Sequence, residues 1–411
     1  MSPHTSTDFE AVYRDLHTHP ELGFQEVRTA GIVAEHLRSA GYEVAEGVGI
    51  TGVVGILDRG PGATVLLRAD MDALPVREET GLPYASTDST INAEGVEVPL
   101  MHACGHDMHT TALLGAASAL AADPTWTGRL MLVFQPAEEQ GSGARTMIED
   151  GLFERFGTPD VVLGQHVAPF PAGAFGLRSG PAFAASDSFV ITLFGRGGHG
   201  SRPETTVDPI VLAASVILRL QTIVSREVAG TETAVLTIGS VHAGSAPNII
   251  PDSAELKISL RSVDPAVRAR VIAAIERIVR GEALTSGADR EPTIVHAHSY
   301  PAVVNDEAAT ARVHAALTAA IPGVQVIDPG LVTGSEDVGM LAEAAGVPCM
   351  YWLLGGADPA PFADVTSQQD LVARVAALPS NHSPLFAPAI IPTLPLGIAA
   401  LSAAALAWLK P

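Results

Sequence analysis

The segment Met101-His-Ala-Cys-Gly-His-Asp-Met-His109 holds the densest group of side chains that could do chemistry. Four potential metal ligands fall within eight positions at the predicted start of a helix: His102, Cys104, His106 and His109. Thiolate and imidazole ligands suit zinc and related transition metals. Two other interpretations fit the segment by itself: a helix N-terminus capped by Asp107, or a Cys104 nucleophile whose pKa is lowered by the helix. The remaining motifs must decide between these three.

Adjacent acids and two further histidines follow predicted strands. Glu138 and Glu139 come directly after an apolar run, where paired acids have no packing role and would repel each other unless a cation lay between them. One could bind a metal while its neighbour acts as a base, although acid pairs on exposed loops are also common. His166 ends another apolar run and His382 lies in Asn381-His-Ser-Pro-Leu-Phe386. A lone histidine of this kind is usually structural, so neither decides the matter alone.

Short apolar runs rich in β-branched residues predict the strands that position these groups. They are Val53–Leu57, Val65–Leu67, Leu130–Phe134 and Val161–Gly164. Continuous apolarity predicts strands buried on both faces, as in an α/β sheet covered by helices, with two helices expected over 8–39 and one over 107–122. Asp70 and Asp72 follow the second run, the glutamate pair the third and His166 the fourth. Ligands in such sheets bind beyond the carboxyl ends of strands, so we expect a single site.

A different order of elements begins at Asp187. The pattern predicts strand 188–194, helix 208–224, strands 234–241 and 254–262, helix 267–284 and strand 292–297. This β-α-β-β-α-β order is ferredoxin-like and predicts an inserted α+β domain over 186–297, between two parts of a catalytic domain, 1–185 and 298–411. Helices over 308–320 and 338–345 and a strand over 347–354 would complete the first sheet, and 356–380 is expected to be a loop or short helix.

Composition excludes several classes of function. The chain has 411 residues, 47% of them apolar, which is enough for a sizeable core, and a formal charge of −21 opposes binding to nucleic acid or an anionic membrane. Two cysteines, Cys104 and Cys349, cannot form a disulfide framework and predict a reducing compartment, the cytoplasm. Met1–Asp8 lacks the apolar core of a secretory signal. The longest apolar run, Leu396–Leu409, is expected to be too short to span a bilayer and to form a buried C-terminal helix.

Taken in order, the motifs closely resemble those of the amidohydrolase branch of the aminoacylase and carboxypeptidase metallopeptidases, which includes hippurate hydrolase and auxin-conjugate hydrolases. They are 17–24 (HTHPELGF), 68–75 (RADMDALP), 101–109, 135–139 (QPAEE), 195–200 (GRGGHG), 246–251 (APNIIP), 334–337 (GSED) and 382–384 (HSP). Each is weak by itself, but the ordered set is highly specific and spans nearly the whole chain. The resemblance implies a zinc-peptidase-like mixed sheet flanked by helices, with an inserted domain for dimerisation and as a lid.

The resemblance also implies roles for individual residues. The metal ligands would be Cys104, His106, Glu139, His166 and His382, which implies a divalent metal centre, two ions of zinc, manganese or cobalt per subunit. Glu138 would be the general base, and Asp70 and Asp72 would have supporting roles, as would Asp107 and Glu336. Carboxypeptidase-type relatives have a His-x-Asp element where Asp70-Met-Asp72 stands.

The inserted domain would supply the remaining groups. By the resemblance His199 would stabilise the oxyanion in the active site of the partner subunit, which implies a homodimer or homotetramer. Asn248 and Arg261 match positions that bind the substrate's carboxylate or carbonyl. Without the resemblance, His199 would be a flexible-loop histidine and Arg261 a partner in a surface salt bridge.

The implied activity is hydrolysis of a small N-acyl amino acid. An aminopeptidase or dipeptidase with the same centre is the alternative, and would need an extra acidic group for the substrate amine. A Cys104 thiol hydrolase or a non-catalytic metal-binding scaffold belongs to another class. Two positions depart from the family: Glu204, where histidine is frequent, and Asn381, where a second histidine is common. An aromatic content of 5% gives no clear pocket for an aromatic acyl group.

Overall fold

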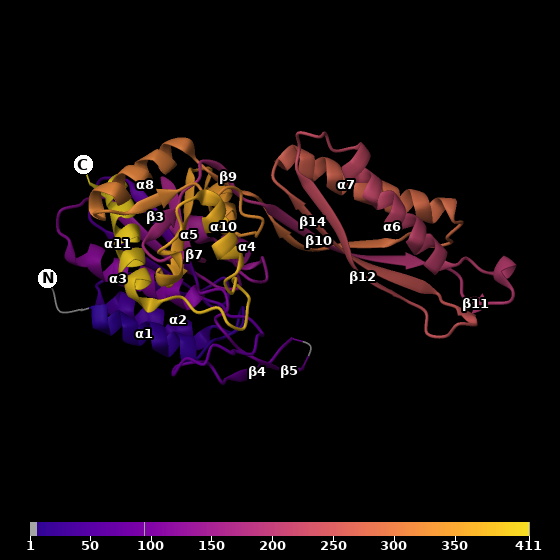
Figure 1. Cartoon of the computed structure of the whole chain (residues 1–411), viewed down its shortest axis with the longest axis horizontal. Helices are drawn as coiled ribbons and strands as arrows, with labels where there is room; N and C mark the ends of the chain where they lie inside the picture. Colours follow the sequence, from indigo (N-terminus) through magenta and orange to yellow (C-terminus); the bar gives the residue numbers. More distant parts are fainter. Residues whose placement is uncertain (1–5, 94, 411) are drawn as a thin grey trace. The chain divides into compact units, whose positions relative to one another are not determined.

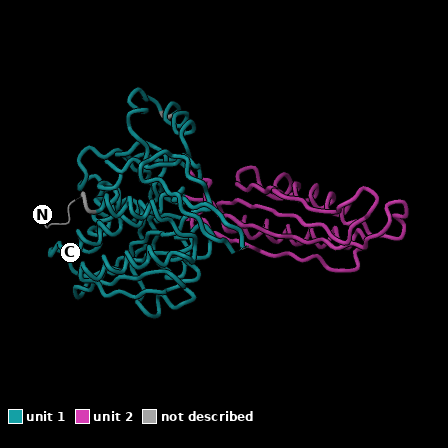
Figure 2. The backbone as a smooth tube through the Cα atoms, turned by 90° about the horizontal axis from the view of Figure 1, so that it is seen from below, with its two compact units in different colours: residues 1–182, 304–330, 337–411 teal, residues 183–303, 331–336 magenta. Residues whose placement is uncertain are grey.

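The structure, a computed structural model, describes residues 6–93 and 95–410. Residues 1–5, part of the segment in which no secretory signal is expected, therefore lie outside the described residues. The chain forms two compact units: Met1–Ala182, Val304–Gly330 and Asp337–Pro411 in the first, Phe183–Val303 and Leu331–Glu336 in the second (Figure 2). These ranges fall close to the predicted domain boundaries, except that 331–336 joins the second unit. The catalytic and dimerisation roles of the two domains stay predictions.

The first unit is built on an eight-stranded sheet, of which Figure 1 labels β3 and β7. The strand order is β1-β2-β6-β3-β7-β18-β8-β17. Its strands are β1 (Glu43–Val48), β2 (Gly52–Asp58), β6 (Arg129–Gln135), β3 (Thr64–Asp70), β7 (Val161–Pro171), β18 (Cys349–Ala357), β8 (Ala174–Gly176) and β17 (Gln325–Ile327). The central strands β6, β3, β7 and β18 are parallel. The pairs β1–β2, β2–β6 and β18–β8 are antiparallel, whereas β17 runs parallel to β8. The predicted mixed sheet is confirmed. The sequence missed β1, β8 and β17, which lie towards the sheet's edges.

Two groups of helices cover this sheet. One comprises α1 (Ser6–Thr18), α2 (Val27–Ser39), α3 (His106–Ala122), α8 (Glu307–Ala320) and α11 (Ile390–Leu409), and the other α4 (Gly143–Glu149) and α9 (Val338–Ala345). Strands β3 and β6 are buried at almost every position, which is the physical reason for their uninterrupted apolar sequence. The peripheral elements are α5 (Leu152–Phe156), η2 (Ala360–Phe362), α10 (Gln368–Ala376), β4 (Ser89–Ile91) and β5 (Glu97–Pro99).

The C-terminal helix α11 is longer than predicted. It begins at Ile390 and has 20 residues, so the argument that this segment is too short to span a bilayer is wrong. By length and composition alone, α11 and α6 (Pro209–Arg226) of the second unit are each long and apolar enough to cross a membrane. The expectation of a buried helix is nevertheless confirmed, because Ala400, Leu401 and Ala404 lie in the core and the helix packs against α3.

The second unit has the predicted β-α-β-β-α-β order. Its elements are β10 (Ala185–Phe194), α6 (Pro209–Arg226), β12 (Ala234–Ala243), β14 (Ser253–Ser262), α7 (Pro265–Thr285) and β15 (Thr293–Tyr300). The sheet is antiparallel in the order β12-β14-β10-β15, which is the ferredoxin-like arrangement. Asp208 and Asp264 cap the two helices directly before a proline, which is a strong start signal. Shorter elements of this unit are β11 (Gly198–His199), η1 (Pro203–Thr205) and β13 (Ile249–Ile250). The two-stranded sheet of β9 (Gly180–Phe183) and β16 (Val303–Asn305) falls where the chain passes from one unit to the other.

Candidate metal centre

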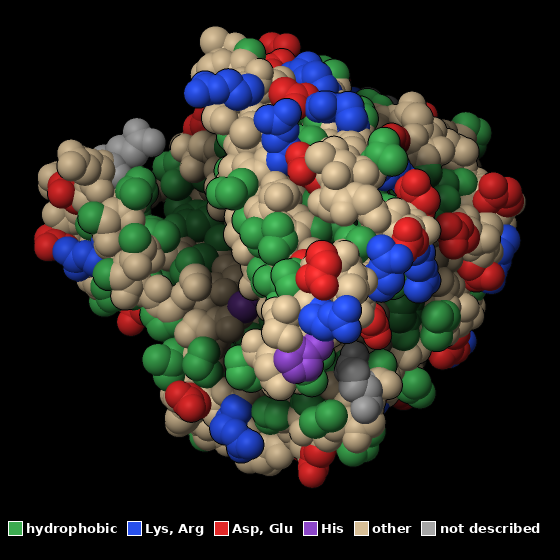
Figure 3. Space-filling model, turned by 90° about the vertical axis from the view of Figure 1, so that its right-hand side faces the viewer, with side chains coloured by type: hydrophobic (Ala, Val, Ile, Leu, Met, Phe, Trp, Pro, Cys, Tyr) green, Lys and Arg blue, Asp and Glu red, His purple; other side chains and the backbone are tan. Residues whose placement is uncertain are grey.

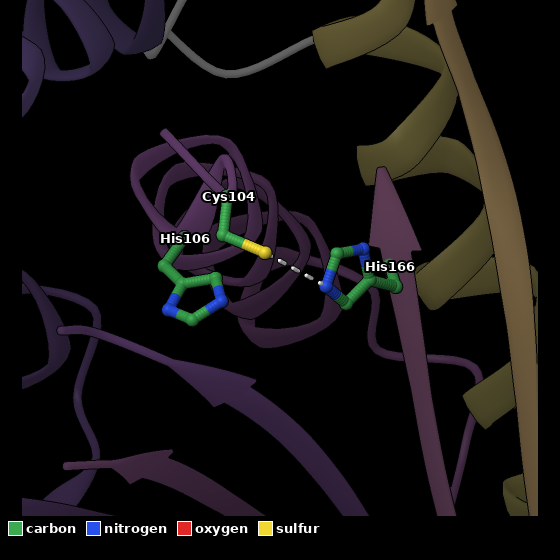
Figure 4. Close-up of side chains that lie close together, drawn as sticks. All are labelled: Cys104, His106 and His166. Carbon is green, nitrogen blue, oxygen red and sulfur yellow. Dashed lines mark hydrogen bonds between the residues drawn. The ribbon is translucent and has the colours of Figure 1, made fainter. Parts of the chain in front are cut away.

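The predicted site residues of the first unit converge at one edge of the parallel strands. Asp70 ends β3 beside Gln135, the last residue of β6, and β7 runs past Gly164, the partner of Arg68, to His166. The start of α3 supplies Cys104 and His106 (Figure 4). The ligand atoms of Cys104, His106 and His166 all lie within 4.8 Å of one another. The side chains that follow these strands lie close together, as predicted, because the carboxyl ends of parallel strands share one edge of the sheet.

Gly105 makes the turn between Cys104 and His106 possible. Its φ of 84° is left-handed, and a Cβ there would lie 2.4 Å from Cγ1 of Val167. Only glycine fits such a position without strain. Gly105 is also the N-cap residue of α3, so the interpretation of Asp107 as the helix cap is wrong.

Hydrogen bonds fix the two histidine rings so that Nε2 of each faces the site. Nδ1 of His166 lies 2.8 Å from the carbonyl oxygen of Val167, to which it donates, which turns its Nε2 towards Sγ of Cys104 at 3.5 Å. Nδ1 of His106 lies 3.2 Å from Oδ1 of Asp72. Metal-binding histidines are commonly held through their second nitrogen in this way.

The surroundings of Nε2 of His106 show whether these residues fit a metal ion. This buried atom has no hydrogen-bond partner among residues 6–93 and 95–410. Carboxylate oxygens of Asp70, Glu139 and Glu138 lie 3.7, 3.8 and 4.0 Å from it. Three carboxylates gathered in the interior repel one another unless a positive charge lies between them. Sulfur, imidazole nitrogen and carboxylate oxygen together suit a borderline transition metal, so the residues fit a divalent cation.

Glu139 joins this group to His382. Nε2 of His382 lies 3.3 Å from Oε1 of Glu139, and hydrogen bonds with Cys104 and Glu139 raise the pKa of His382 to about 10. Burial raises the pKa of Glu139, but His382 and His106 outweigh it and lower that pKa. The five predicted ligands, together with Glu138, thus fall into three overlapping groups: Cys104–His106–His166, Cys104–Glu139–His382 and His106–Glu138–Glu139. These are more donors than one tetrahedral ion uses.

Cys104 does not have the environment of an activated nucleophile. Its side chain is buried, and burial, followed by the charge of Glu139, raises the pKa of the thiol. The raised pKa does not support the alternative in which the helix lowers the pKa of Cys104 and activates it as a nucleophile.

The supporting acids contact the ligand candidates directly. Oδ2 of Asp72 accepts a hydrogen bond of 2.9 Å from the backbone N–H of Glu139, while its Oδ1 faces His106. Asp70 accepts from Arg68 at 2.6 Å, and burial, which raises the pKa of Asp70, is outweighed by His106 and Arg68, which lower it well below its usual range. Asp70 thus stays charged beside the site.

The sequence did not predict a role for Arg68, a buried arginine that contacts Asp70. Arg68 also donates to Gln135 and Asp337, each over 2.9 Å, and Asp337 accepts from the backbone of Ala144. Arg68, Gln135 and Asp337 all lie in motifs quoted above. Their place in those motifs was the sequence signal that could have pointed to them, but the sequence assigns them no role. Glu336 is buried, belongs to the second unit and directly precedes Asp337 in the chain; its supporting role stays a prediction.

Asp107 faces away from these ligand groups into a second buried cluster. Its Oδ2 lies 2.6 Å from Nδ1 of His17, and Nε2 of His17 lies 3.1 Å from Glu78. Burial lowers the pKa of His17, but Asp107 and Glu78 outweigh it and raise this pKa to about 10. The first motif of the chain therefore supplies a buried imidazolium held between two carboxylates.

The second unit brings two of its three predicted site residues together. His199 and Asn248 line one pocket with residues 197–198 and 249–252. The backbone N–H of Ser201 donates to Nδ1 of His199 over 3.1 Å, so a neutral ring carries its proton on Nε2, where it can donate. Figure 3 shows charged and apolar side chains interspersed on the face that it views.

Arg261 lies elsewhere in this unit. It is near the end of β14 and donates to the hydroxyl of Ser335. No ion pair of Arg261 is found among residues 6–93 and 95–410, so the described part of the chain does not support the salt-bridge alternative. The pocket reaches β14 at its start, where Asp252 precedes the strand. Arg261 lies nine positions further along the extended chain than Asp252, roughly 30 Å. Glu204 is exposed, and its Oε1 lies 3.7 Å from Nε of Arg202.

Comparisons with known proteins agree with this geometry. The sequence profile of peptidase family M20/M25/M40 matches residues 66–379. Hippurate hydrolase of Campylobacter jejuni is 49% identical over 276 residues, 67% of this chain and 69% of the relative. Thermostable carboxypeptidase 1 of Saccharolobus solfataricus is 40% identical over 350 residues, 84% of each chain. A Bacillus subtilis crystal structure, described as a dinuclear metal binding peptidase from the M20 family, has a TM-score of 0.74 and 30% identity, covering 98% of this chain and 99% of that one.

Proposed function

The chain belongs to peptidase family M20/M25/M40 and is an enzyme of that hydrolase family, and on this premise we propose that it cleaves the amide bond of a small N-acyl amino acid, releasing the acyl acid and the free amino acid. The resemblance drawn from the motifs is confirmed, and a relative named for hydrolysing hippurate, an N-acyl amino acid, supports this substrate class. One observation carries the proposal: Nε2 of His106 is buried without a hydrogen-bond partner among the described residues and faces three carboxylates.

Cys104, His106, Glu139, His166 and His382 would hold the metal, two divalent ions of zinc, manganese or cobalt. The number of donors and the dinuclear description of the Bacillus subtilis structure support two ions. When bound, the ions polarise the scissile carbonyl and lower the pKa of water at the site towards ~7. Asp72 would keep His106 and the Glu139 backbone in place through its two hydrogen bonds.

Glu138 would act as the general base. Its carboxylate is buried, and Oε2 lies 4.0 Å from Nε2 of His106, beside the proposed ligands. Glu138 takes a proton from the attacking water and returns it to the departing nitrogen. His199, whose Nδ1 accepts from Ser201 and whose Nε2–H is therefore available, donates to the developing oxyanion, and Asn248 and Arg261 bind the substrate's carboxylate or carbonyl.

A homodimer would reconcile the positions of these last three residues. A small substrate cannot reach both ends of β14, so each active site would take His199 and Asn248 from one subunit and Arg261 from the other. The strand β12 supports this assembly, because it lies at the edge of its sheet and exposes Val235 and Val241. Exposed Val211 and Leu218 on α6 would extend the apolar contact with a second copy, and a homotetramer would pair such dimers. Two buried free cysteines support a cytoplasmic location.

Peptide hydrolysis is the second candidate function. The similarity to thermostable carboxypeptidase 1 favours it, because removing a C-terminal residue also breaks an amide bond to an amino acid that bears a free carboxylate. An aminopeptidase or dipeptidase would use the same centre with a free amine on the other side of the bond.

One assay tests metal, base and substrate class together. Amine release is measured from N-acetyl, longer N-acyl and benzoyl amino acids and from dipeptides, with chelated protein to which zinc, manganese or cobalt is restored. Glu138→Gln is assayed beside Glu149→Gln, a matched change of an exposed acid on α4. We expect restored metal to revive hydrolysis, Glu138→Gln to abolish it with metal still bound, and Glu149→Gln to leave it intact.

Other results would support one of the alternative functions. Activity that persists after chelation and disappears on alkylation would indicate a Cys104 thiol hydrolase. Stoichiometric metal binding without turnover of any substrate would indicate a non-catalytic scaffold. Preference for dipeptides over N-acyl amino acids would support the peptidase.

A further inference from the structure

Asn381, the position at which a second histidine is common, ties together the segments that carry three of the proposed ligands. Its side-chain Nδ2 donates to the carbonyl oxygen of Cys104 over 3.1 Å and to that of Val167 over 3.2 Å. Val167 directly follows His166, and Nδ2 also lies 3.8 Å from Sγ of Cys104. A single amide nitrogen therefore joins the start of α3 to β7.

His382, the next residue, is held in a conformation that needs outside support. Its φ is 70°, in the left-handed region, and its backbone N–H donates to the carbonyl oxygen of Ala103 over 2.8 Å. Residues other than glycine persist in this region only when the surrounding structure holds them there. The hydrogen bonds of Asn381 and His382 to neighbouring residues 103 and 104 provide that hold.

We propose that Asn381 is the positioning residue that sets the mutual placement of Cys104, His166 and His382 for metal binding in this chain. The proposal rests on the metal centre proposed above and deepens it. A primary amide carries two N–H groups on one nitrogen, so it can serve two carbonyl oxygens that lie close together. A neutral imidazole carries one N–H, so a histidine at this position could serve only one of them.

The test measures metal affinity directly, by competition with a chromogenic chelator, using zinc and the full-length protein. Asn381→Ala removes both donors, and Asn381→His returns one. We expect Asn381→Ala to weaken zinc binding about 10–100-fold, as is usual when a group that orients metal ligands is lost. Asn381→His should recover part of that loss. The thermal midpoint of each metal-free protein is recorded in parallel.

The outcomes separate this inference from the function on which it rests. If the parent protein binds no zinc, the proposed metal centre fails. If the parent binds zinc and Asn381→Ala matches its affinity within about twofold, only the positioning role is wrong, and a lowered thermal midpoint would then show that Asn381 merely stabilises the fold. An Asn381→His variant no better than Asn381→Ala would overturn the role assigned to the donated hydrogens.

Discussion

The backbone N–H of Val167 donates a hydrogen bond of 2.8 Å to Nε2 of His109. Nδ1 of the same ring lies 2.6 Å from Asp70, so both nitrogens of this buried histidine are used within the protein. Three residues earlier on α3, His106 has its Nε2 without such a partner among the described side chains. Two histidines that look equivalent in the sequence therefore have different capacities to bind a metal.

Replacing these two histidines should separate metal binding from stability. We expect His106→Ala to lose metal from the protein at equilibrium dialysis, because a ligand is removed. His109→Ala should keep the same metal content, yet lower the free energy of unfolding by about 1–3 kcal/mol, because Asp70 and the Val167 N–H lose a buried partner. Metal analysis and urea unfolding measure the two effects. Equal metal loss in both variants would contradict the distinction.

The buried His17 should make stability depend on alkaline pH. Its pKa is raised from an ordinary value near 6.5 to about 10, so its contribution is fully present below pH 6.5 and is lost as pH rises towards 10. His17→Gln should lower the free energy of unfolding by about 3–5 kcal/mol at pH 6.5, because Asp107 and Glu78 remain buried without a cation. Urea midpoints measured between pH 6.5 and 10 should converge for parent and variant. Curves that stay parallel would exclude an imidazolium at this position.

Gly105 and Gly31 offer a matched pair of glycine substitutions. Gly105→Ala places a Cβ against Val167 on left-handed backbone and should cost about 1–3 kcal/mol and weaken metal binding. Gly31, inside α2, has open space around the added Cβ, so Gly31→Ala should stabilise by about 0.5–1 kcal/mol. Thermal unfolding and metal titration check both. A Gly105→Ala protein with unchanged metal affinity would show that this turn does not position Cys104.

His199 should affect turnover without affecting metal content. Removal of one donor to an oxyanion typically lowers kcat by about 10²–10³, so His199→Ala should fall in this range. His314→Ala, an exposed histidine on α8, is the control and should retain full activity. Steady-state kinetics and metal analysis on the same preparations measure kcat and the metal content of both variants. Loss of metal from His199→Ala, or unchanged kcat, would remove the histidine from the proposed chemistry.

The sequence could predict the strands and the identity of the clustered groups because both are local properties. Uninterrupted apolar runs mark β3, β6 and β7, since these strands are covered on both faces. The β-α-β-β-α-β order of the second unit was equally readable. Edge strands such as β17 escaped notice, because three partly exposed residues leave no apolar pattern. The length of α11 was misjudged because its prolines lie within the first turns, where a helix tolerates them.

Residue types and spacing by themselves identified a dense group of potential metal ligands, a glutamate pair and the motifs of a hydrolase family. Only the tertiary structure decided which histidine nitrogens remain available, that Asp107 pairs with His17 and not with the helix end, and that Arg261 lies about nine residues of strand away from the His199 pocket. The physical reason is that a ring nitrogen's availability depends on its hydrogen-bond partners, and those come from segments far apart in the chain. Val167 with His109, and Asn381 with Cys104, meet only after the sheet and α3 have packed.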